Sequence, residues 1–373
     1  MSPEEKKPKI VMIAAGDTFG GAERQLLTLC AEGKNAFQSV IFPTLAGPLL
    51  QHAQEAGLDV RPLLLGKGVL AQGRALAKVL QDEQFNLVHV HGYRGSVLAL
   101  LAFVFGAERP VVRTVHGAPE VAGKMALYSK LGDYANRLCA GHTVYVSKDL
   151  AAHLGRESKK EHVIHNGIRL AKEKGTAPEE YAPYEKNLLV AGRLEPVKNV
   201  GAAIEAMANK EVPAHVHLHI VGDGPQREAL EARTQELKLS ERVSFHGFRP
   251  DVLRFIAHAD ALLLPSLHEG VPYVLLEALS FGTPVIAAKV GGIPEVAAHL
   301  VEAYLLTGSY NKAATHADTL GGAIRVVCTN DELRKKLEEQ GKLRVQSAFS
   351  AESMTNKYAQ LYSSLWGRGL KRS

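Results

Sequence analysis

Two carboxylates stand out in a largely apolar segment, HEGVPYVLLEALSFGTPVIA, at residues 268–287. Pro272 is a favoured first residue of a helix, so we expect Glu269 in a loop and Glu277 on the helix that follows. Eight residues on a helix span about 12 Å, which disfavours the closely spaced acid pair of a glycosidase. Two acids that bind different parts of a polyhydroxylated ligand fit better, because carboxylates accept strong hydrogen bonds from hydroxyls. The alternative is a structural role at a helix end or turn.

Two basic residues follow a predicted strand at residues 188–192 and precede a helix, in the sequence GRLEPVKN at residues 192–199. Arg193 and Lys198 would therefore lie at the carboxyl end of a strand, beside a helix N-terminus. This combination predicts a site for a diphosphate. Ordinary surface charges after a turn are the alternative.

A third candidate site combines glycines and a histidine. Gly20 and Gly21 lie between a strand and a helix, where their backbone N–H groups can approach an anion. The sequence there is neither G-x-G-x-x-G nor a Walker A motif. His116 ends another predicted strand and should point into a crevice. His89 and His91 alternate on one strand without clustered acids or cysteines, so we expect structural roles for them and no metal site.

Apolar, β-branched runs alternate with helical segments, which predicts parallel sheets covered on both faces. One series of strands is expected at residues 9–15, 39–44, 60–65, 87–91, 111–116, 143–147 and 163–165, and a second at 188–192, 216–221, 243–246, 261–265, 284–288 and 303–306. A charged, proline-containing stretch separates the series. We therefore expect an α/β protein of two tandem Rossmann-like, doubly wound domains facing a central cleft. The expected boundaries are 1–170 for the first domain, 171–186 for a linker and 187–349 for the second domain.

Composition agrees with two globular domains in 373 residues. Net charge is +5, and residues 1–178 hold 22 basic against 16 acidic residues, which leaves 22 against 23 for the remainder. The excess is either a solvated face or a surface for an anionic acceptor or membrane, and Lys67, Arg74 and Lys78 surround a predicted amphipathic helix suited to the second reading. Three widely spaced cysteines and a short longest apolar run, 97–107, indicate a cytoplasmic protein, with peripheral membrane contact left open. We expect no nucleic-acid partner.

Seven sequence elements together resemble the family 4 retaining glycosyltransferases of the GT-B fold over residues 9–350. They are the two glutamates, the Arg193 and Lys198 element, GDGP at 222–225, HNGI at 165–168, GGAE at 20–23, GTPV at 282–285 and GGIPE at 291–295. The resemblance implies transfer of a sugar from a nucleotide sugar, with UDP as the commonest carrier, without a metal or other cofactor and with retention at the anomeric carbon. It also implies that residues 350–373 pack back on the first domain.

The resemblance assigns roles to individual residues. Arg193 and Lys198 would bind the donor diphosphate, Glu277 the ribose hydroxyls and Glu269 hydroxyls of the transferred sugar. His116 would lie near that sugar. The remaining expected donor-binding residues are Gly20 and Gly21 beside the phosphates, Gly247 and Phe248 beside the base, and Gly192, Gly222, Gly270 and Val271.

One departure concerns the segment after the first glutamate. Many family members have Phe-Gly there, whereas this chain has Val271-Pro272-Tyr273. Proline has no N–H to donate to the sugar, so the identity of the sugar stays open. Two other functions also stay open: a nucleotide-sugar 2-epimerase of the same fold, and a nucleotide-sugar-binding protein that has lost its activity. The four charged residues Arg193, Lys198, Glu269 and Glu277 argue against the inactive binding protein. The acceptor, whether a glycan, a lipid-linked, a phosphorylated or another small molecule, is not specified by the sequence.

Overall fold

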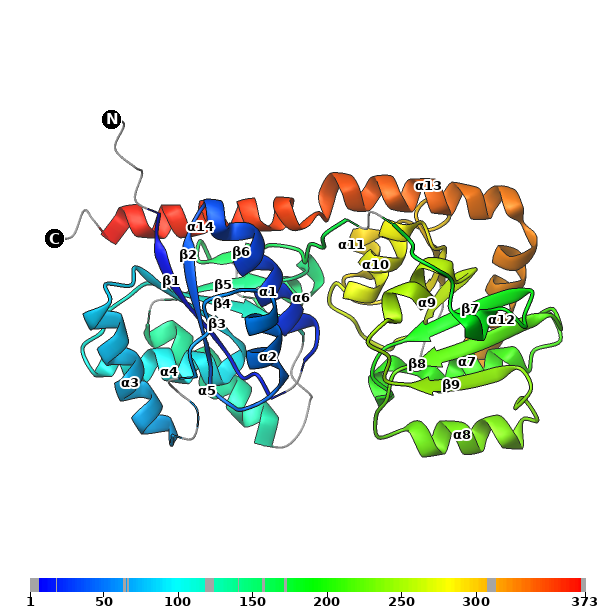
Figure 1. Cartoon of the computed structure of the whole chain (residues 1–373), viewed down its shortest axis with the longest axis horizontal. Helices are drawn as coiled ribbons and strands as arrows, with labels where there is room; N and C mark the ends of the chain where they lie inside the picture. Colours follow the sequence, from blue (N-terminus) through cyan, green and yellow to red (C-terminus); the bar gives the residue numbers. More distant parts are fainter. Residues whose placement is uncertain are drawn as a thin grey trace. The chain divides into compact units, whose positions relative to one another are not determined.

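The computed structural model describes residues 7–17, 19–62, 65, 67–117, 124–139, 141–155, 158–170, 173–306 and 313–369. The chain divides into two compact units, which are Met1–Gly167 with Ala351–Ser373, and Ile168–Ser350. Each unit contains one six-stranded sheet whose strand pairs are all parallel, with helices on both of its faces (Figure 1). The predicted fold class of two doubly wound α/β domains is confirmed.

The sheet of the first unit has the strand order β2-β1-β3-β4-β5-β6. Its strands are β1 Lys9–Ala14, β2 Gln38–Pro43, β3 Leu87–His91, β4 Val111–Val115, β5 His142–Tyr145 and β6 Glu161–Val163, and its helices are α1 Gly21–Glu32, α2 Pro48–Glu55, α3 Val69–Asp82, α4 Gly92–Val104, α5 Lys124–Leu138, α6 Lys148–Leu154 and α14 Ala351–Gly369. Strand β1 pairs with β2 on one side and β3 on the other. The order therefore reverses between β1 and β3, and ligands of such sheets bind at this point, beyond the carboxyl ends of the strands.

Alternating residues of β1 build the two cores of this unit. Ile10 and Met12 face a cluster that includes Tyr358 and Tyr362 of α14, while Val11 and Ile13 face a cluster formed with α3 and α4. The last helix of the chain thus packs against the first strand (Figure 1). Burial of both faces explains why the strands are apolar throughout.

The sheet of the second unit has the order β12-β11-β10-β7-β8-β9. Its strands are β7 Lys186–Ala191, β8 Val216–Val221, β9 Val243–Gly247, β10 Ala261–Leu264, β11 Val285–Ala288 and β12 Tyr304–Leu306, and its helices are α7 Val200–Met207, α8 Arg227–Glu236, α9 Val252–His258, α10 Tyr273–Phe281, α11 Ile293–Val296, α12 Ala313–Thr329 and α13 Asp331–Ala348. Here β7 pairs with β8 and β10, so the order reverses between β7 and β10. The ligand-binding edge of this sheet is therefore expected beyond β7 and β10.

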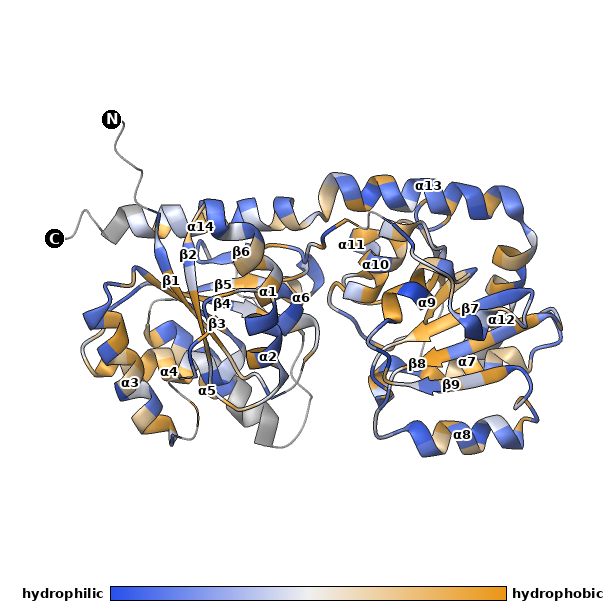
Figure 2. Cartoon of the chain, in the orientation of Figure 1, coloured by the Kyte–Doolittle hydropathy of each residue, from blue (hydrophilic) through white to orange (hydrophobic). Residues whose placement is uncertain are grey.

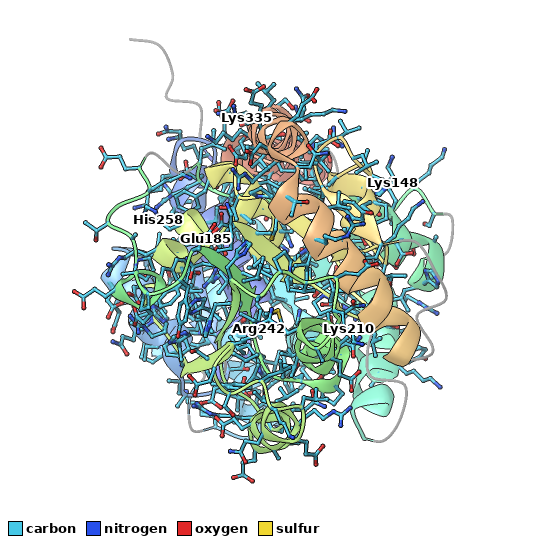
Figure 3. The ribbon with its side chains drawn as sticks, turned by 90° about the vertical axis from the view of Figure 1, so that its right-hand side faces the viewer. Lys148, Glu185, Lys210, Arg242, His258 and Lys335 are labelled. Carbon is cyan, nitrogen blue, oxygen red and sulfur yellow. The ribbon has the colours of Figure 1, made fainter. Side chains whose placement is uncertain are left out.

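Apolar side chains fill both faces of the second sheet, and charged side chains lie outside it. Leu188 and Val190 join a core with α7 and α12, whereas Leu189 joins one with α9 and α10. Orange segments occur along β7 and β8 in Figure 2, whereas the helices of this unit mix orange and blue. Lys210 and Lys335, both labelled in Figure 3, are exposed residues of this unit.

The stretch expected as a linker, 171–186, belongs to the second unit, which begins at Ile168. Residues 171 and 172 lie outside the described part. Tyr181 is 5% exposed, packs in the core and donates from its hydroxyl to the carbonyl oxygen of Phe255 at 3.0 Å. The buried position of Tyr181 could not be predicted from the charged, proline-containing composition of this stretch, because one buried aromatic residue produces no hydrophobic periodicity.

The strand predicted at 60–65 is wrong for the residues described there. Val60 forms only an isolated parallel bridge with Ile41. The N–H of Arg61 donates to the carbonyl oxygen of Ile41 at 2.8 Å, and among the described residues no strand is formed around this bridge. Residues 63, 64 and 66 lie outside the described part. In the parts of the chain that are described, no helix combines the length and apolar character needed to cross a bilayer.

Candidate active site

Backbone hydrogen bonds hold three loops together at the carboxyl edge of the second sheet. The N–H of Gly192 donates to Val221 at 3.0 Å, and that of Gly222 donates to Gly247 at 2.8 Å. The N–H of Leu194 donates to the carbonyl oxygen of Asp223 at 2.9 Å. This edge is a framework of interlocked backbone rather than a set of independent loops.

Two glycines permit these loops to approach one another. Gly222 has φ +140°, and a β-carbon there would lie 1.8 Å from the carbonyl oxygen of Gly192. Gly291 has φ +52°, and a β-carbon there would lie 1.8 Å from the carbonyl oxygen of Glu269. Any side chain would force backbone apart at both positions. Gly291 therefore fixes the loop that carries Glu269.

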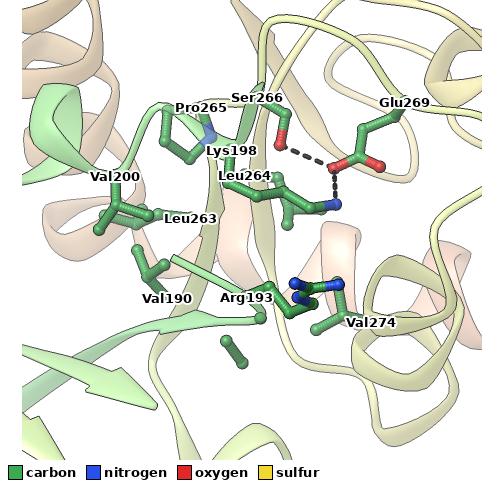
Figure 4. Close-up of a pocket in the computed structure, with 12 residues that line it drawn as sticks. Val190, Arg193, Lys198, Val200, Leu263, Leu264, Pro265, Ser266, Glu269 and Val274 are labelled. Carbon is green, nitrogen blue, oxygen red and sulfur yellow. Dashed lines mark hydrogen bonds and ion pairs between the residues drawn. The ribbon is translucent and has the colours of Figure 1, made fainter. Parts of the chain in front are cut away.

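An ion pair lies at the point where the strand order reverses. Lys198, in the turn after β7, donates from Nζ to Oε1 of Glu269, in the loop after β10, at 2.7 Å. Ser266 donates from its hydroxyl to the same oxygen at 2.7 Å. Figure 4 shows both contacts. The side chain of Glu269 is 8% exposed and that of Lys198 31% exposed. A buried carboxylate is thus held in one position while its cation remains accessible to a ligand.

Arg193 lies beside this pair. Its side chain is 63% exposed and forms an ion pair with Glu195 at 2.9 Å. The pocket in Figure 4 brings together four predicted residues, Gly192, Arg193, Lys198 and Glu269. Its other lining residues are Val190, Ala191, Val200, Leu263, Leu264, Pro265, Ser266 and Val274. Two cations and one buried carboxylate at one pocket suit a ligand that carries both phosphates and hydroxyls.

The other predicted residues of the second unit lie on the elements around this pocket. Gly270 and Val271 continue the Glu269 loop, and Val271 is 2% exposed. Glu277 is half-buried on α10, as expected for a helix that starts after Pro272. Gly247 ends β9, and Phe248 is 78% exposed. A bare aromatic ring beside a positive-φ glycine is available for contact with a flat ligand group.

In the first unit, a carboxylate of the chain itself binds the turn after β1. Gly20 is the N-cap of α1, and its N–H donates to Oε2 of the buried Glu23 at 3.0 Å. Gly21 begins the helix. The expected approach of an external anion to Gly20 would therefore compete with the Glu23 carboxylate.

Three histidines form a group at the carboxyl ends of β3 and β4, in which His89 and His91 are buried and His116 is half-buried. His91 Nδ1 and His116 Nε2 are 3.0 Å apart, and the rings stack with centroids 5.3 Å apart. His89 is hydrogen-bonded to Thr114 at 2.8 Å and to the Tyr362 hydroxyl at 2.7 Å. Burial lowers the pKa of His116 to about 4, and burial with the neighbouring His116 lowers the pKa of His89 to about 3. The histidines are therefore neutral at pH 7, and the structural roles expected for His89 and His91 include holding His116.

Sequence reasoning missed Ser266 and the partner role of His91. Ser266 lies three residues before Glu269, directly after a strand and Pro265, and this short spacing was an available signal. The contact between His91 and His116 joins two strands 25 residues apart. Only the pairing of β3 with β4 brings them together.

Comparison with known proteins places the chain in a family. The model described as Glycosyltransferase Family 4 matches residues 19–172, and that described as Glycosyl transferases group 1 matches residues 173–344. The lipopolysaccharide core biosynthesis glycosyltransferase LpsD of Rhizobium meliloti (strain 1021) is 31% identical over 242 residues, which cover 63% of this chain and 68% of LpsD. The chain belongs to glycosyltransferase family 4. The predicted family is thereby confirmed.

Other relatives and folds agree with this family 4 glycosyltransferase. The N-acetyl-alpha-D-glucosaminyl L-malate synthase of Bacillus anthracis is 27% identical over 311 residues, with 79% of this chain and 78% of the synthase covered. The structure of Anabaena Alr3699/HepE in complex with UDP-glucose has a TM-score of 0.82 at 22% identity, and covers 96% of this chain and 100% of that one. These likenesses confirm the GT-B fold of the glycosyltransferase.

Proposed function

We propose that this glycosyltransferase is retaining and metal-independent and transfers a hexose or N-acetylhexosamine from a UDP-sugar. Two relatives support a UDP donor: the Escherichia coli UDP-Gal:alpha-D-GlcNAc-diphosphoundecaprenol alpha-1,3-galactosyltransferase, 27% identical over 309 residues, and Alr3699/HepE, solved with UDP-glucose. The observation that carries the proposal is the contact of Lys198 with Glu269 at 2.7 Å, in one pocket with Arg193. Such a pocket offers cations to a diphosphate and a carboxylate to sugar hydroxyls.

The charges suit the bond that must break. When the anomeric carbon separates from the diphosphate oxygen, negative charge grows on the diphosphate and positive charge on the sugar. Arg193 and Lys198 would stabilise that negative charge more in the transition state than in the ground state. The acceptor oxygen would bond to the same face of the anomeric carbon, and its proton would pass to the departing phosphate oxygen. This route needs neither a metal ion nor a dedicated protein base.

The remaining donor contacts follow from the residues around the pocket. Glu269 would accept hydrogen bonds from sugar hydroxyls and Glu277 from the ribose, while the base would lie against Gly247 and Phe248. His116, Gly20 and Gly21 would contribute from the first unit.

We propose a lipid-linked or phosphorylated acceptor and peripheral contact with an anionic membrane. The names of two relatives contain L-malate and diphosphoundecaprenol, which are both acidic molecules. Lys67, Arg74 and Lys78 are exposed at α3, as are the apolar Val69 and Leu70. Basic and apolar side chains on one helix suit an anionic lipid surface. Vesicles of phosphatidylglycerol should retain the protein at low salt, and Lys67→Glu with Lys78→Glu should release it.

Two alternative functions predict different products. An epimerase would change the sugar of the donor without an acceptor, and an inactive binder would bind the nucleotide without forming product. Transfer to an acceptor with an unchanged anomeric configuration would separate the proposed function from both.

The first test is a thermal-shift titration with UDP, GDP and ADP. A ligand at 100 times its dissociation constant stabilises a folded protein by about 2.7 kcal/mol. We expect UDP to do so with the unmodified chain and with Lys210→Ala, which removes an exposed lysine of the same unit. Lys198→Ala should abolish the effect. Selective stabilisation by another nucleotide would replace UDP in the proposal, and no stabilisation by any of the three would contradict the donor site.

A further inference from the structure

Arg94 is a half-buried cation that lacks an acidic partner. It lies in the first turn of α4, three residues after the end of β3. Its Nη2 donates to the amide oxygen of Gln72 at 3.1 Å, and its Nε is buried without a hydrogen-bond partner. Among the residues that the structure describes, no carboxylate lies within ion-pair distance of this guanidinium. The positive charge is therefore balanced only by a neutral amide.

Two other arginines of the first unit have acidic partners. Arg61 forms ion pairs with Asp59 and Glu83, and Arg113 forms one with Asp133. A charge removed from water is costly unless an opposite charge compensates it. A position that keeps an uncompensated guanidinium is therefore suited to receive an anion from outside the chain.

The surroundings of Arg94 hold it in place. Gln72 is 1% exposed, and its amide nitrogen donates to the carbonyl oxygen of Thr44 at 3.0 Å. Thr44 follows β2, is also 1% exposed, and its hydroxyl has no hydrogen-bond partner. The guanidinium is thus fixed by a chain of two hydrogen bonds that starts at the backbone after β2.

The place of these residues in the sheet is that of a ligand site. Thr44 and Arg94 follow β2 and β3, the two neighbours of β1. The strand order of the first unit reverses between β1 and β3, where ligands of doubly wound sheets bind beyond the carboxyl ends (Figure 1). This edge belongs to the unit without the proposed diphosphate pocket.

We propose that Arg94 binds an acidic group, a phosphate or a carboxylate, of the acceptor molecule. Guanidinium groups bind both anions through paired N–H donors. That the anion belongs to the acceptor depends on the proposed transferase function. The presence of an anion site at Arg94 does not depend on that function.

The test measures anion binding by a variant that lacks the proposed diphosphate site. In the Lys198→Ala background, thermal shifts are recorded with inorganic phosphate, L-malate and farnesyl diphosphate in detergent, at constant ionic strength. Arg94→Gln removes the charge, Arg94→Lys keeps it without the paired donors, and Arg137→Gln removes an exposed arginine of the same unit as a control. We expect Arg94→Gln to raise the dissociation constant at least tenfold, Arg94→Lys to raise it less, and Arg137→Gln to leave it unchanged.

The choice of anions separates a soluble acidic acceptor from a lipid-linked one. Binding of phosphate or malate that depends on Arg94 supports a soluble acidic acceptor, and binding of the farnesyl compound alone supports a lipid-linked one. Equal binding by Arg94→Gln and Arg137→Gln, or no anion binding at all, overturns the site. UDP stabilisation of the single Arg94→Gln variant should match that of the unmodified chain, so failure of the donor site is recognised separately.

Discussion

Lys198 Nζ lies 2.7 Å from Glu269 Oε1, although the two residues are 71 positions apart. The loops that carry them follow β7 and β10, which are neighbours in the sheet and mark the reversal of strand order. The fold therefore brings a cation and a buried carboxylate together before any ligand is present. Much of the cost of orienting these charges is met during folding, which favours catalysis by a preorganised site.

The ion pair predicts a specific pattern of stability. Lys198→Met leaves the Glu269 carboxylate buried with Ser266 as a remaining donor, and should lower the free energy of unfolding by about 1–3 kcal/mol. Adding Glu269→Gln removes the uncompensated charge and should restore most of the loss. Neither variant should be stabilised by UDP. Urea unfolding measures the first effect, and equal stability of the single and double variants would contradict coupling between the two residues.

Much of the fold could be predicted because parallel strands buried on both faces leave continuous apolar runs. The predicted strands at 87–91 and 216–221 coincide with β3 and β8, and the other expected strands that were confirmed differ by one or two residues at their ends. The exception at 60–65 had the right composition. Its pairing is limited to the isolated bridge between Val60 and Ile41, which composition alone does not reveal.

The candidate site could be predicted residue by residue but not as an arrangement. Arg193, Lys198 and Glu269 each follow a predicted strand, so their place at the sheet edge was expected. That Lys198 contacts Glu269 depends on β7 lying next to β10, and periodicity does not specify the order of strands. The contact of Arg94 with Gln72 could not be predicted either, because periodicity does not specify which residues of α3 and α4 meet.

Gly291 and Gly57 form a matched pair of positive-φ glycines. Their φ angles are +52° and +61°, but a β-carbon at Gly291 would meet the Glu269 carbonyl oxygen, whereas one at Gly57 would meet nothing within 4 Å. Gly57→Ala should therefore cost only the backbone strain, about 1 kcal/mol. Gly291→Ala should cost more and weaken donor binding, because the Glu269 loop must move. Unfolding and UDP titrations of both variants test this, and equal losses would refute the role of the close contact.

Buried neutral histidines predict acid sensitivity. The pKa of His89 is lowered to about 3 from an ordinary value of 6.5, so below pH 6.5 the unfolded chain takes up a proton that the folded chain excludes. The free energy of unfolding should fall as pH decreases below 6.5, by about 1.4 kcal/mol per pH unit for each such histidine once its unfolded form is protonated. His89→Gln should reduce this slope between pH 6 and 5 by about that amount. An unchanged slope in urea unfolding would mean that His89 is protonated in the folded state.

The proposed chemistry predicts activity without divalent metal. Arg193 and Lys198 supply the positive charge at the diphosphate, so excess EDTA should leave transfer within about twofold of the untreated rate, since no bound Lewis acid would be lost. Arg193→Ala should reduce turnover by about tenfold or more, as expected for loss of one charge-stabilising donor. Product formation from a UDP-sugar is the measurement. Complete inhibition by EDTA that added Mg²⁺ restores would overturn metal independence.

The contact between His91 and His116 predicts a positioning role that can be separated from donor binding. In two neutral rings, one N–H is used between His91 Nδ1 and His116 Nε2, so one of the two outer nitrogens carries the other proton. Both outer nitrogens are buried without partners in the chain. His116 is thereby held in one orientation, and the protonation of its outer nitrogen is coupled to the tautomer of His91.

Replacement of His91 should therefore affect transfer through His116. The amide of His91→Asn can still hydrogen-bond to His116 Nε2, whereas the side chain of His91→Leu cannot. We expect His91→Leu and His116→Ala to lower kcat by about tenfold or more while UDP stabilisation is unchanged, and His91→Asn to keep a larger share of activity. If His91→Asn and His91→Leu were equally impaired at equal stability, the hydrogen bond would have no part in orienting His116, because only one of the two variants preserves it.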